Sequence, residues 1–303
     1  MAFIEKPWSF HVAGSRLAGK VLLPKGVKNP PAVVMAHGFG AEAAFGLRPF
    51  AERFASRGMA VFIFDYRGFG ESEGRVRHYV HPFRHVEDWQ GAVENARAYN
   101  GVDGSRLGIW GTSFSGGHVI VTAARVPGIR AMVAQVPFVD GFTVLSGMRP
   151  RIMAALTVAA VQDIVAMLRS REPRWVPLVG DPGTLAALDK PGTMEAFMQI
   201  VPEDLRAKWP NKTPARGLLL VPLYRPVRLA AQVACPSLVI AADNDNLIPV
   251  SAVVKTASKI PNAQLVRLPV GHFDPYLGEI FEKTVALEAD FFEKHLGPLA
   301  RPR

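Results

Sequence analysis

Short apolar runs alternate with amphipathic segments over the first half of the chain. The most apolar runs are AVVMA (32–36), AVFIF (60–64), RLGIW (106–110) and AMVAQ (131–135). Apolar runs of this length without polar alternation are typical of strands that are covered on both faces of a parallel sheet. We therefore predict four central strands, preceded by two further strands at 10–14 and 19–24.

The segments between these strands have the spacing of amphipathic helices. Residues 82–99 place Val86, Trp89 and Val93 on one face of a helix, and residues 46–57 show the same period. Alternation of strands and helices predicts an α/β fold with a mostly parallel sheet.

The pattern changes between residues 138 and 232, where proline recurs and no strand is predicted. Helical patterns occur there at 152–168, 193–200 and 202–208. The earlier alternation then resumes with strands at 237–242 and 263–268, a helix near 250–258 and a closing helix at 276–295. Because the sheet is interrupted and then completed, we predict a mainly helical cap at 138–232, inserted into a core formed by 1–137 and 233–303.

The longest apolar stretch, residues 152–168, is broken by Gln162 and Asp163. It is about one turn short of the roughly 20 residues that cross a membrane comfortably. We therefore expect a buried helix or one that covers a cleft, and no membrane partner. Together with Phe138, Phe142 and Trp175, this helix predicts a hydrophobic pocket for an acyl or aromatic group.

Composition narrows the choice of partner and compartment. The chain has 303 residues and a net charge of +9, but its basic residues are scattered among acidic ones, which argues against a nucleic-acid partner. A single cysteine, Cys235, excludes an internal disulfide and a zinc-type cysteine cluster. The first residues lack a basic start followed by an apolar core, so we expect no signal peptide and a cytoplasmic location.

The stretch GTSFSGG (111–117) follows the strand 106–110 directly and precedes a helix-like segment. A serine between a strand and a helix, with small residues two before and two after it, has the context of a nucleophile elbow. The frame Gly111-x-Ser113-x-Ser115 puts Ser113 at the centre, with Ser115 where glycine is more common. Ser115 as nucleophile is the alternative, but it would lie two residues into the helix. We expect the small size of Ser115 to matter and its hydroxyl to be incidental.

A serine hydroxyl needs a base, and the base needs an acid that orients it. In this architecture the chain order is serine, acid, histidine. His272 lies in a loop directly after the strand 263–268, where ligands meet a parallel sheet. His118 is on the helix of the elbow and is expected to be structural, whereas His295 is expected at the surface.

The acid is expected at the end of the preceding strand, 237–242. Asp245 lies two residues into the loop, where its carboxylate could turn toward a histidine on the next loop, and we favour it. Asp243, which continues the strand, is the main rival. Asp140, which follows the strand 131–135, is a weaker alternative.

The oxyanion that forms on an attacked carbonyl needs preorganised donors. The backbone N–H of Phe114, which follows the serine, is one candidate. The other is the N–H of Phe39 in the loop HGFG (37–40), which follows the third strand and in which Gly38 permits close backbone approach.

Five sequence motifs follow one another along the chain. They are HGFG (37–40), DYRGFGES (65–72), GTSFSGG (111–117), DNDNLIP (243–249) and GHF (271–273). With these motifs the chain resembles the α/β-hydrolase superfamily, most of all bacterial esterase-like members similar to acetylxylan esterase, dienelactone hydrolase and X-Pro dipeptidyl-peptidase. The resemblance implies an eight-stranded sheet, a Ser–His–Asp triad and no metal or organic cofactor.

The expected activity is a serine hydrolase that cleaves a carboxylic ester or thioester in a small molecule. An amidase or peptidase, or a C–C-bond hydrolase, would use the same triad, and an exposed apolar cap face could form a homodimer. A different class also has to be weighed: Gly38-x-Gly40-x-x-Ala43 loosely matches a dinucleotide-binding fingerprint, with Asp65 at the end of the next strand. A non-catalytic binding protein is the remaining alternative.

Overall fold

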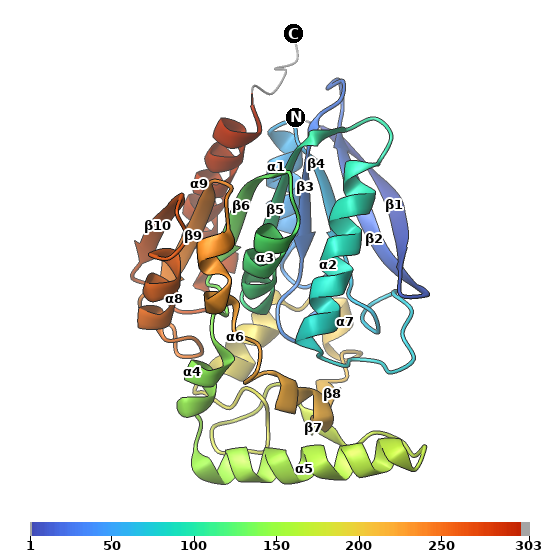
Figure 1. Ribbon diagram of the computed structural model, residues 1–303, viewed down its shortest axis with the longest axis vertical. Coiled ribbons are helices and arrows are strands. Elements are labelled where there is room, and N and C mark those ends of the chain that lie inside the picture. Colours follow the sequence, from blue (N-terminus) through green and yellow to red (C-terminus); the bar gives the residue numbers. More distant parts are fainter. Residues whose placement is uncertain (1, 298–303) are drawn as a thin grey trace.

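The computed structural model describes residues 2–297 and has an eight-stranded sheet with the order β1-β2-β4-β3-β5-β6-β9-β10 (Figure 1). The strands are β1 (Phe3–Val12), β2 (Ser15–Pro24), β3 (Pro31–Ala36), β4 (Ala60–Phe64), β5 (Asp103–Thr112), β6 (Ile129–Gln135), β9 (Ser237–Ala242) and β10 (Ala263–Leu268). β1 pairs antiparallel with β2 and β2 with β4, whereas all the other neighbours are parallel. The predicted α/β fold with a mostly parallel sheet is therefore confirmed.

The first predicted strand, 10–14, is wrong at both ends. The strand begins at Phe3, and Ala13 and Gly14 form the turn to β2 with φ values of 47° and 79°. β1 is an outer strand, and along it buried positions such as Trp8 and Phe10 alternate with exposed ones. The absence of a continuous apolar run hid its first half from sequence analysis.

Helices cover both faces of the sheet and enclose one core on each (Figure 1). They are α1 (Arg48–Ser56), α2 (Pro82–Arg97), α3 (Phe114–Arg125), α8 (Val250–Ala257) and α9 (Gly278–Leu296). α2, α3 and α8 pack on one face and α1 and α9 on the other, where Phe54 meets Phe292 edge to face. All six residues of β3 and of β9 are buried, as expected of strands covered on both sides.

Segment 138–232 leaves the sheet after β6 and returns to β9, which pairs directly with β6. It contains helices α4 (Gly141–Ser146), α5 (Pro150–Leu168), α6 (Thr193–Ile200) and α7 (Glu203–Arg206), strands β7 (Trp175–Pro177) and β8 (Lys212–Pro214), and short 3-10 turns that include η1 (Ala215–Leu220). Most of the segment lies beyond the carboxyl ends of the central strands (Figure 1). The expectation of no strands here is wrong, because β7 and β8 form a small antiparallel pair. Each has only three residues and ends in proline, too short to give a pattern.

Of the two expectations for α5, a buried helix is wrong and a helix that covers a cleft is confirmed, because side chains such as Leu156 line a cavity. It lies across the end of the molecule remote from the N-terminus (Figure 1), and only 28% of its most apolar 18-residue window is buried. Its inner face packs on Val176 and Ala215, and Asp163 on that face forms a buried salt bridge with Arg216 at 2.8 Å. The outer face carries apolar side chains that contact solvent.

Candidate active site

Ser113 occupies the turn between β5 and α3 in a strained backbone conformation. Its φ and ψ are 55° and −119°, outside the regions that L-residues populate readily. The turn is held on both sides, because the Ser113 N–H donates to the Gln135 carbonyl at 2.9 Å and the Ser113 carbonyl accepts from the Phe138 N–H at 2.7 Å. Such a strand-to-helix turn presents the hydroxyl above the sheet edge, as an elbow requires.

Two glycines keep the space around this turn open. A Cβ on Gly111 would lie 2.3 Å from the Ser115 carbonyl oxygen, which is a backbone atom that cannot move independently of the turn. A Cβ on Gly38 would lie 3.2 Å from the Ser113 Cβ. The HGFG loop therefore lies directly against the serine, as the motif order predicted.

A continuous chain of hydrogen bonds joins three side chains from three separate loops. The Nδ1 of His272 lies 2.6 Å from Oδ2 of Asp245, and its Nε2 lies 2.9 Å from Oγ of Ser113. A carboxylate can only accept hydrogen bonds, so Nδ1 carries the proton and Nε2 is free to accept from the serine hydroxyl. The other oxygen of Asp245 accepts from the N–H groups of Leu247 and Ile248, which fixes the carboxylate. The structure brings together the three residues that the sequence singled out.

The rival acids lie in other interactions. Asp243 forms a hydrogen bond of 2.8 Å with the guanidinium of Arg267 at the surface. Asp140 caps α4 and forms two hydrogen bonds with Arg225, at 2.7 and 2.9 Å. Neither carboxylate contacts His272, so Asp245 alone of the three acids considered has the geometry to orient it.

Ser115 is fully buried and points away from His272. Its Oγ accepts from the Tyr66 hydroxyl at 3.0 Å and from Nε1 of Trp89 at 3.2 Å, and Trp89 also donates to Tyr66. A buried hydroxyl in a closed network cannot reach a substrate, which argues against Ser115 as the nucleophile. Its hydroxyl therefore contributes to the structure, because two buried donors bind it, and the expectation that it is incidental to activity stays a prediction.

We expect Ser115→Ala to lower the free energy of unfolding by about 1–3 kcal/mol, because the Tyr66 and Trp89 donors lose a buried acceptor. Hydrolytic rate should stay within a few-fold of wild type. Denaturant titration of the variant measures the effect. In the background Tyr66→Phe the same substitution should cost at least as much, since Nε1 of Trp89 then loses Ser115 as well as the Tyr66 hydroxyl as acceptors. Unchanged stability of Ser115→Ala would show that the network contributes nothing.

The two candidate oxyanion donors have no competing acceptor. No hydrogen bond within residues 2–297 uses the backbone N–H of Phe39 or of Phe114. Phe114 is the first residue of α3, so its N–H also lies at the positive end of the helix dipole. The rings of Phe39 and Phe114 contact each other edge to face at 5.2 Å, which holds the two loops side by side.

Three other histidines lie beneath the elbow and are kept neutral by burial. Desolvation lowers the pKa of His37 to about 3 and the pKa values of His85 and His118 well below 6.5. His118 pairs with the Tyr224 hydroxyl at 2.7 Å and packs on the ring of Phe114. It is structural, as expected. His295 is only half-buried, against Phe291 at the end of α9.

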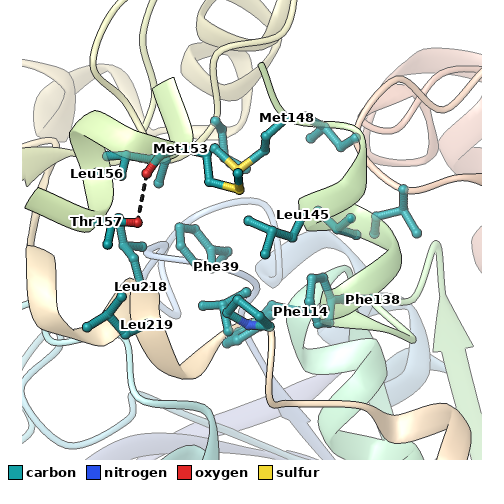
Figure 2. A pocket seen from close by; sticks show the side chains of 18 of the residues that line it. Phe39, Phe114, Phe138, Leu145, Met148, Met153, Leu156, Thr157, Leu218 and Leu219 are labelled. Carbon is teal, nitrogen blue, oxygen red and sulfur yellow. Dashed lines mark hydrogen bonds between the residues drawn. The ribbon is translucent and has the colours of Figure 1, made fainter. Parts of the chain in front are cut away.

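A cavity of about 550 Å³ opens at Ser113 and extends under segment 138–232 (Figure 2). Much of its wall is formed by Leu145 of α4, Met148 between α4 and α5, Leu156 of α5 and Leu218 of η1. No charged side chain lines it, and apart from Ser113 the one polar side chain is Thr157, whose hydroxyl donates to the Met153 carbonyl at 2.8 Å. The cavity suits an apolar group of substantial size.

Part of this lining was predicted from the sequence, and the helix 152–168 contributes to it through residues such as Leu156 and Thr157. Phe138 contributes, as predicted, but Phe142 is 61% exposed with Arg225 against its ring, and Trp175 lies elsewhere, beneath Lys212. The residues that were missed come mainly from α4, from η1 and from the loop of Asp245. The apolar run GLLLVPL (217–223) was the available signal for η1.

Comparison with known proteins shows the family to which this chain belongs. Residues 28–177 match the family described as serine aminopeptidase, S33. The Quorum-quenching protein AidA of Acinetobacter baumannii (strain MDR-ZJ06) is 36% identical over 264 residues, which cover 87% of this chain and 86% of that protein. The chain belongs to the α/β-hydrolase superfamily. It is an enzyme of the hydrolase class, as the motifs predicted.

Two further proteins are similar to this chain. Thiohydrolase aneE of Aspergillus aculeatus (strain ATCC 16872 / CBS 172.66 / WB 5094) is 35% identical over 175 residues, which cover 57% of this chain and 54% of that protein. The crystal structure of the alpha/beta hydrolase GrgF from Penicillium sp. sh18 has the same fold, with a TM-score of 0.82, 20% identity and coverage of 97% and 99% of the two chains.

The geometry of the loop 37–40 is inconsistent with dinucleotide binding. In a dinucleotide-binding fold a helix begins directly at the glycine-rich turn, whose backbone amides bind the pyrophosphate. Here α1 begins only at Arg48, and Gly38 lies against Ser113 instead of facing an open site. The oxygen Oδ1 of Asp65 accepts from the Ala43 N–H at 2.7 Å, so this carboxylate holds the same loop.

Proposed function

We propose that this enzyme is a serine hydrolase that cleaves carboxylic esters or thioesters with an apolar acyl group. The observation that carries the proposal is the hydrogen-bonded chain from Asp245 through His272 to Ser113, placed at the mouth of an uncharged cavity. The name of the similar thiohydrolase aneE supports a thioester as one form of substrate.

In the proposed mechanism the substrate's acyl chain lies in the cavity and its carbonyl lies above Ser113. Nε2 of His272 takes the serine proton as Oγ attacks the carbonyl carbon, and Asp245 stabilises the imidazolium that forms. The N–H groups of Phe39 and Phe114 bind the oxyanion. His272 then protonates the leaving alcohol or thiol, and water releases the acid from the acyl-enzyme by the reverse route.

The lining of the cavity favours an acyl group over the N-terminal residue of a peptide. An aminopeptidase has to bind a substrate ammonium, and desolvating that charge without a carboxylate partner is costly. No aspartate or glutamate lines the cavity at Ser113. We therefore place esters and thioesters ahead of amides, although the matched family is described as serine aminopeptidase.

A panel of substrates tests the proposal. We expect kcat/KM to rise about fourfold for each methylene added to the acyl chain until the cavity is full, because each buried methylene contributes about 0.8 kcal/mol. Octanoyl p-nitrophenyl ester, with six more methylenes, should exceed the acetyl ester by roughly 10³-fold. A matched octanoyl thioester should also be cleaved, and an octanoyl anilide much more slowly. A higher rate with a free-amino peptide anilide than with any ester would overturn the proposal.

Leu145→Trp should shorten the acyl chain that the enzyme prefers, because Leu145 points into the cavity (Figure 2). We expect the octanoyl-to-acetyl ratio of kcat/KM to fall at least tenfold while the acetyl rate stays near wild type. The acetyl ester is thus the internal control for a correctly formed Ser113 site. An unchanged ratio would mean that the acyl chain lies elsewhere.

A further inference from the structure

The outer face of α5 carries an apolar stripe that has Gln162 on one side and an arginine at each end. Its apolar residues are Ala154, Val158, Val161, Val165 and Leu168. At 100° per residue, Arg151, Val158, Val165 and Arg169 lie within about 40° of one another around the helix. The two arginines are 18 residues apart, which is five helical turns, so both project from the same face. Arg149 and Arg171 lie just beyond them and are also exposed.

This stripe is exposed to an extent that is unusual for aliphatic side chains. Val158 is 57% exposed, Val161 52% and Leu168 77%. From Arg149 to Arg171 the only acidic residue is Asp163, and it lies on the opposite face, buried against Arg216. A contiguous apolar face without acidic groups marks an interaction surface rather than ordinary solvent-exposed structure.

The surroundings of α5 are inconsistent with a membrane span. Within residues 2–297 it is the one helix whose length and mean hydropathy would permit crossing a bilayer. However, its inner face packs on Val176 and Ala215, and the buried Asp163–Arg216 pair ties it to η1. A helix held along its length in this way can lie in the plane of an interface but cannot insert across it.

The charges favour an anionic lipid surface over a second copy of the chain. If two copies paired through this stripe about a twofold axis with antiparallel helices, Arg151 of one would face Arg169 of the other at both ends. Parallel helices would place like arginines side by side. Either arrangement gathers the four guanidinium groups of Arg151 and Arg169 from two copies, with no carboxylate on the stripe itself. Lipid phosphates instead attract arginines, whose long stems let them reach the headgroups from an apolar face.

We propose that the α5 stripe docks the enzyme on the surface of anionic phospholipid bilayers. Ala154 and Val158 belong both to the stripe and to the wall of the cavity at Ser113, so the docked face borders the acyl site. An apolar substrate dissolved in the bilayer would thus reach the cavity with little exposure to water. The docking does not depend on the proposed hydrolysis, whereas this route for the substrate does.

Vesicle co-sedimentation tests the docking directly. We expect wild type to bind vesicles of equal parts phosphatidylglycerol and phosphatidylcholine at least tenfold more tightly than pure phosphatidylcholine, and to release at high salt. The variant Val161→Asp/Val165→Asp should bind the anionic vesicles at least tenfold more weakly than wild type, because it puts two negative charges into the stripe. The affinity of Arg151→Gln/Arg169→Gln for anionic vesicles should fall about tenfold, whereas its affinity for pure phosphatidylcholine should not change. None of these four residues lines the cavity.

Hydrolysis of a water-soluble acetyl ester separates docking from catalysis, and both double variants should keep the wild-type rate. If they keep that rate but bind vesicles like wild type, the docking proposal is wrong and the proposed function stands. The lipid proposal is also wrong if wild type does not bind vesicles and sedimentation equilibrium shows a dimer. If Val161→Asp/Val165→Asp dissociates that dimer, the stripe is a contact between two copies. If wild type binds vesicles but cleaves no ester, the proposed function fails and the docking stands.

Discussion

Ser113→Ala should reduce kcat for the octanoyl ester by roughly 10⁴- to 10⁶-fold. The substitution removes the oxygen that lies 2.9 Å from His272 Nε2 and leaves the rest of the site in place. Groups that act as one unit lose nearly all their effect when a single member is removed, and the residual rate comes from the oxyanion donors and from binding. Steady-state kinetics on the purified variant measure the loss.

Ser115→Ala is the matched control for this experiment. It removes the same atom two residues away, from a side chain that contacts Tyr66 and Trp89 rather than His272. Its stability should fall while its rate is retained. If Ser115→Ala were inactive and Ser113→Ala active, the elbow would be centred two residues later than we infer.

Asp245→Asn should lower kcat by roughly 10⁴-fold with little change in KM. The amide side chain can donate to Nδ1 of His272, which favours the imidazole tautomer with its proton on Nε2, and that tautomer cannot accept from Ser113. The amide also cannot stabilise the imidazolium. Because Oδ1 is held by the N–H groups of Leu247 and Ile248, we expect the substituted side chain to stay in place.

Asp243→Asn distinguishes the acid of the site from its neighbour. Asp243 lies two residues earlier and binds Arg267 at the surface, so its loss should change kcat less than twofold. Exposed pairs of this kind contribute about 1 kcal/mol or less to stability. A rate loss in Asp243→Asn equal to that in Asp245→Asn would contradict the assignment of the acid.

Much of the fold and of the site could be predicted because the informative patterns are local. β4, β9 and β10 were predicted at their observed bounds. β4 and β9 are buried along their whole length and therefore apolar on both faces, whereas β10 is a partly exposed edge strand. Ser113, Asp245 and His272 could be selected because each follows a predicted strand and together they have the order of the architecture. The elbow also requires small residues at fixed distances from Ser113, which the clash predicted at Gly111 explains.

The features that were missed depend on contacts between distant segments. The hydroxyl of Ser115 matters because Tyr66 and Trp89 bring donors to it, and nothing in GTSFSGG indicates them. The sequence left open whether α5 is buried or covers a cleft, because its apolar composition fits both. Only the tertiary structure shows that one face packs on η1 and the other contacts solvent. The proline-rich connections of segment 138–232 carry no period from which the cavity lining could be inferred.

Covalent labelling with a fluorophosphonate tests the central claim most directly, because this probe forms a stable adduct only with an activated serine. We predict one adduct per wild-type chain, on the peptide that contains Ser113, formed more slowly when the octanoyl ester is present. Ser113→Ala should take up none, and Ser115→Ala should be labelled like wild type. An unlabelled wild-type enzyme that still cleaves the ester, or an adduct on any residue other than Ser113, would contradict the account.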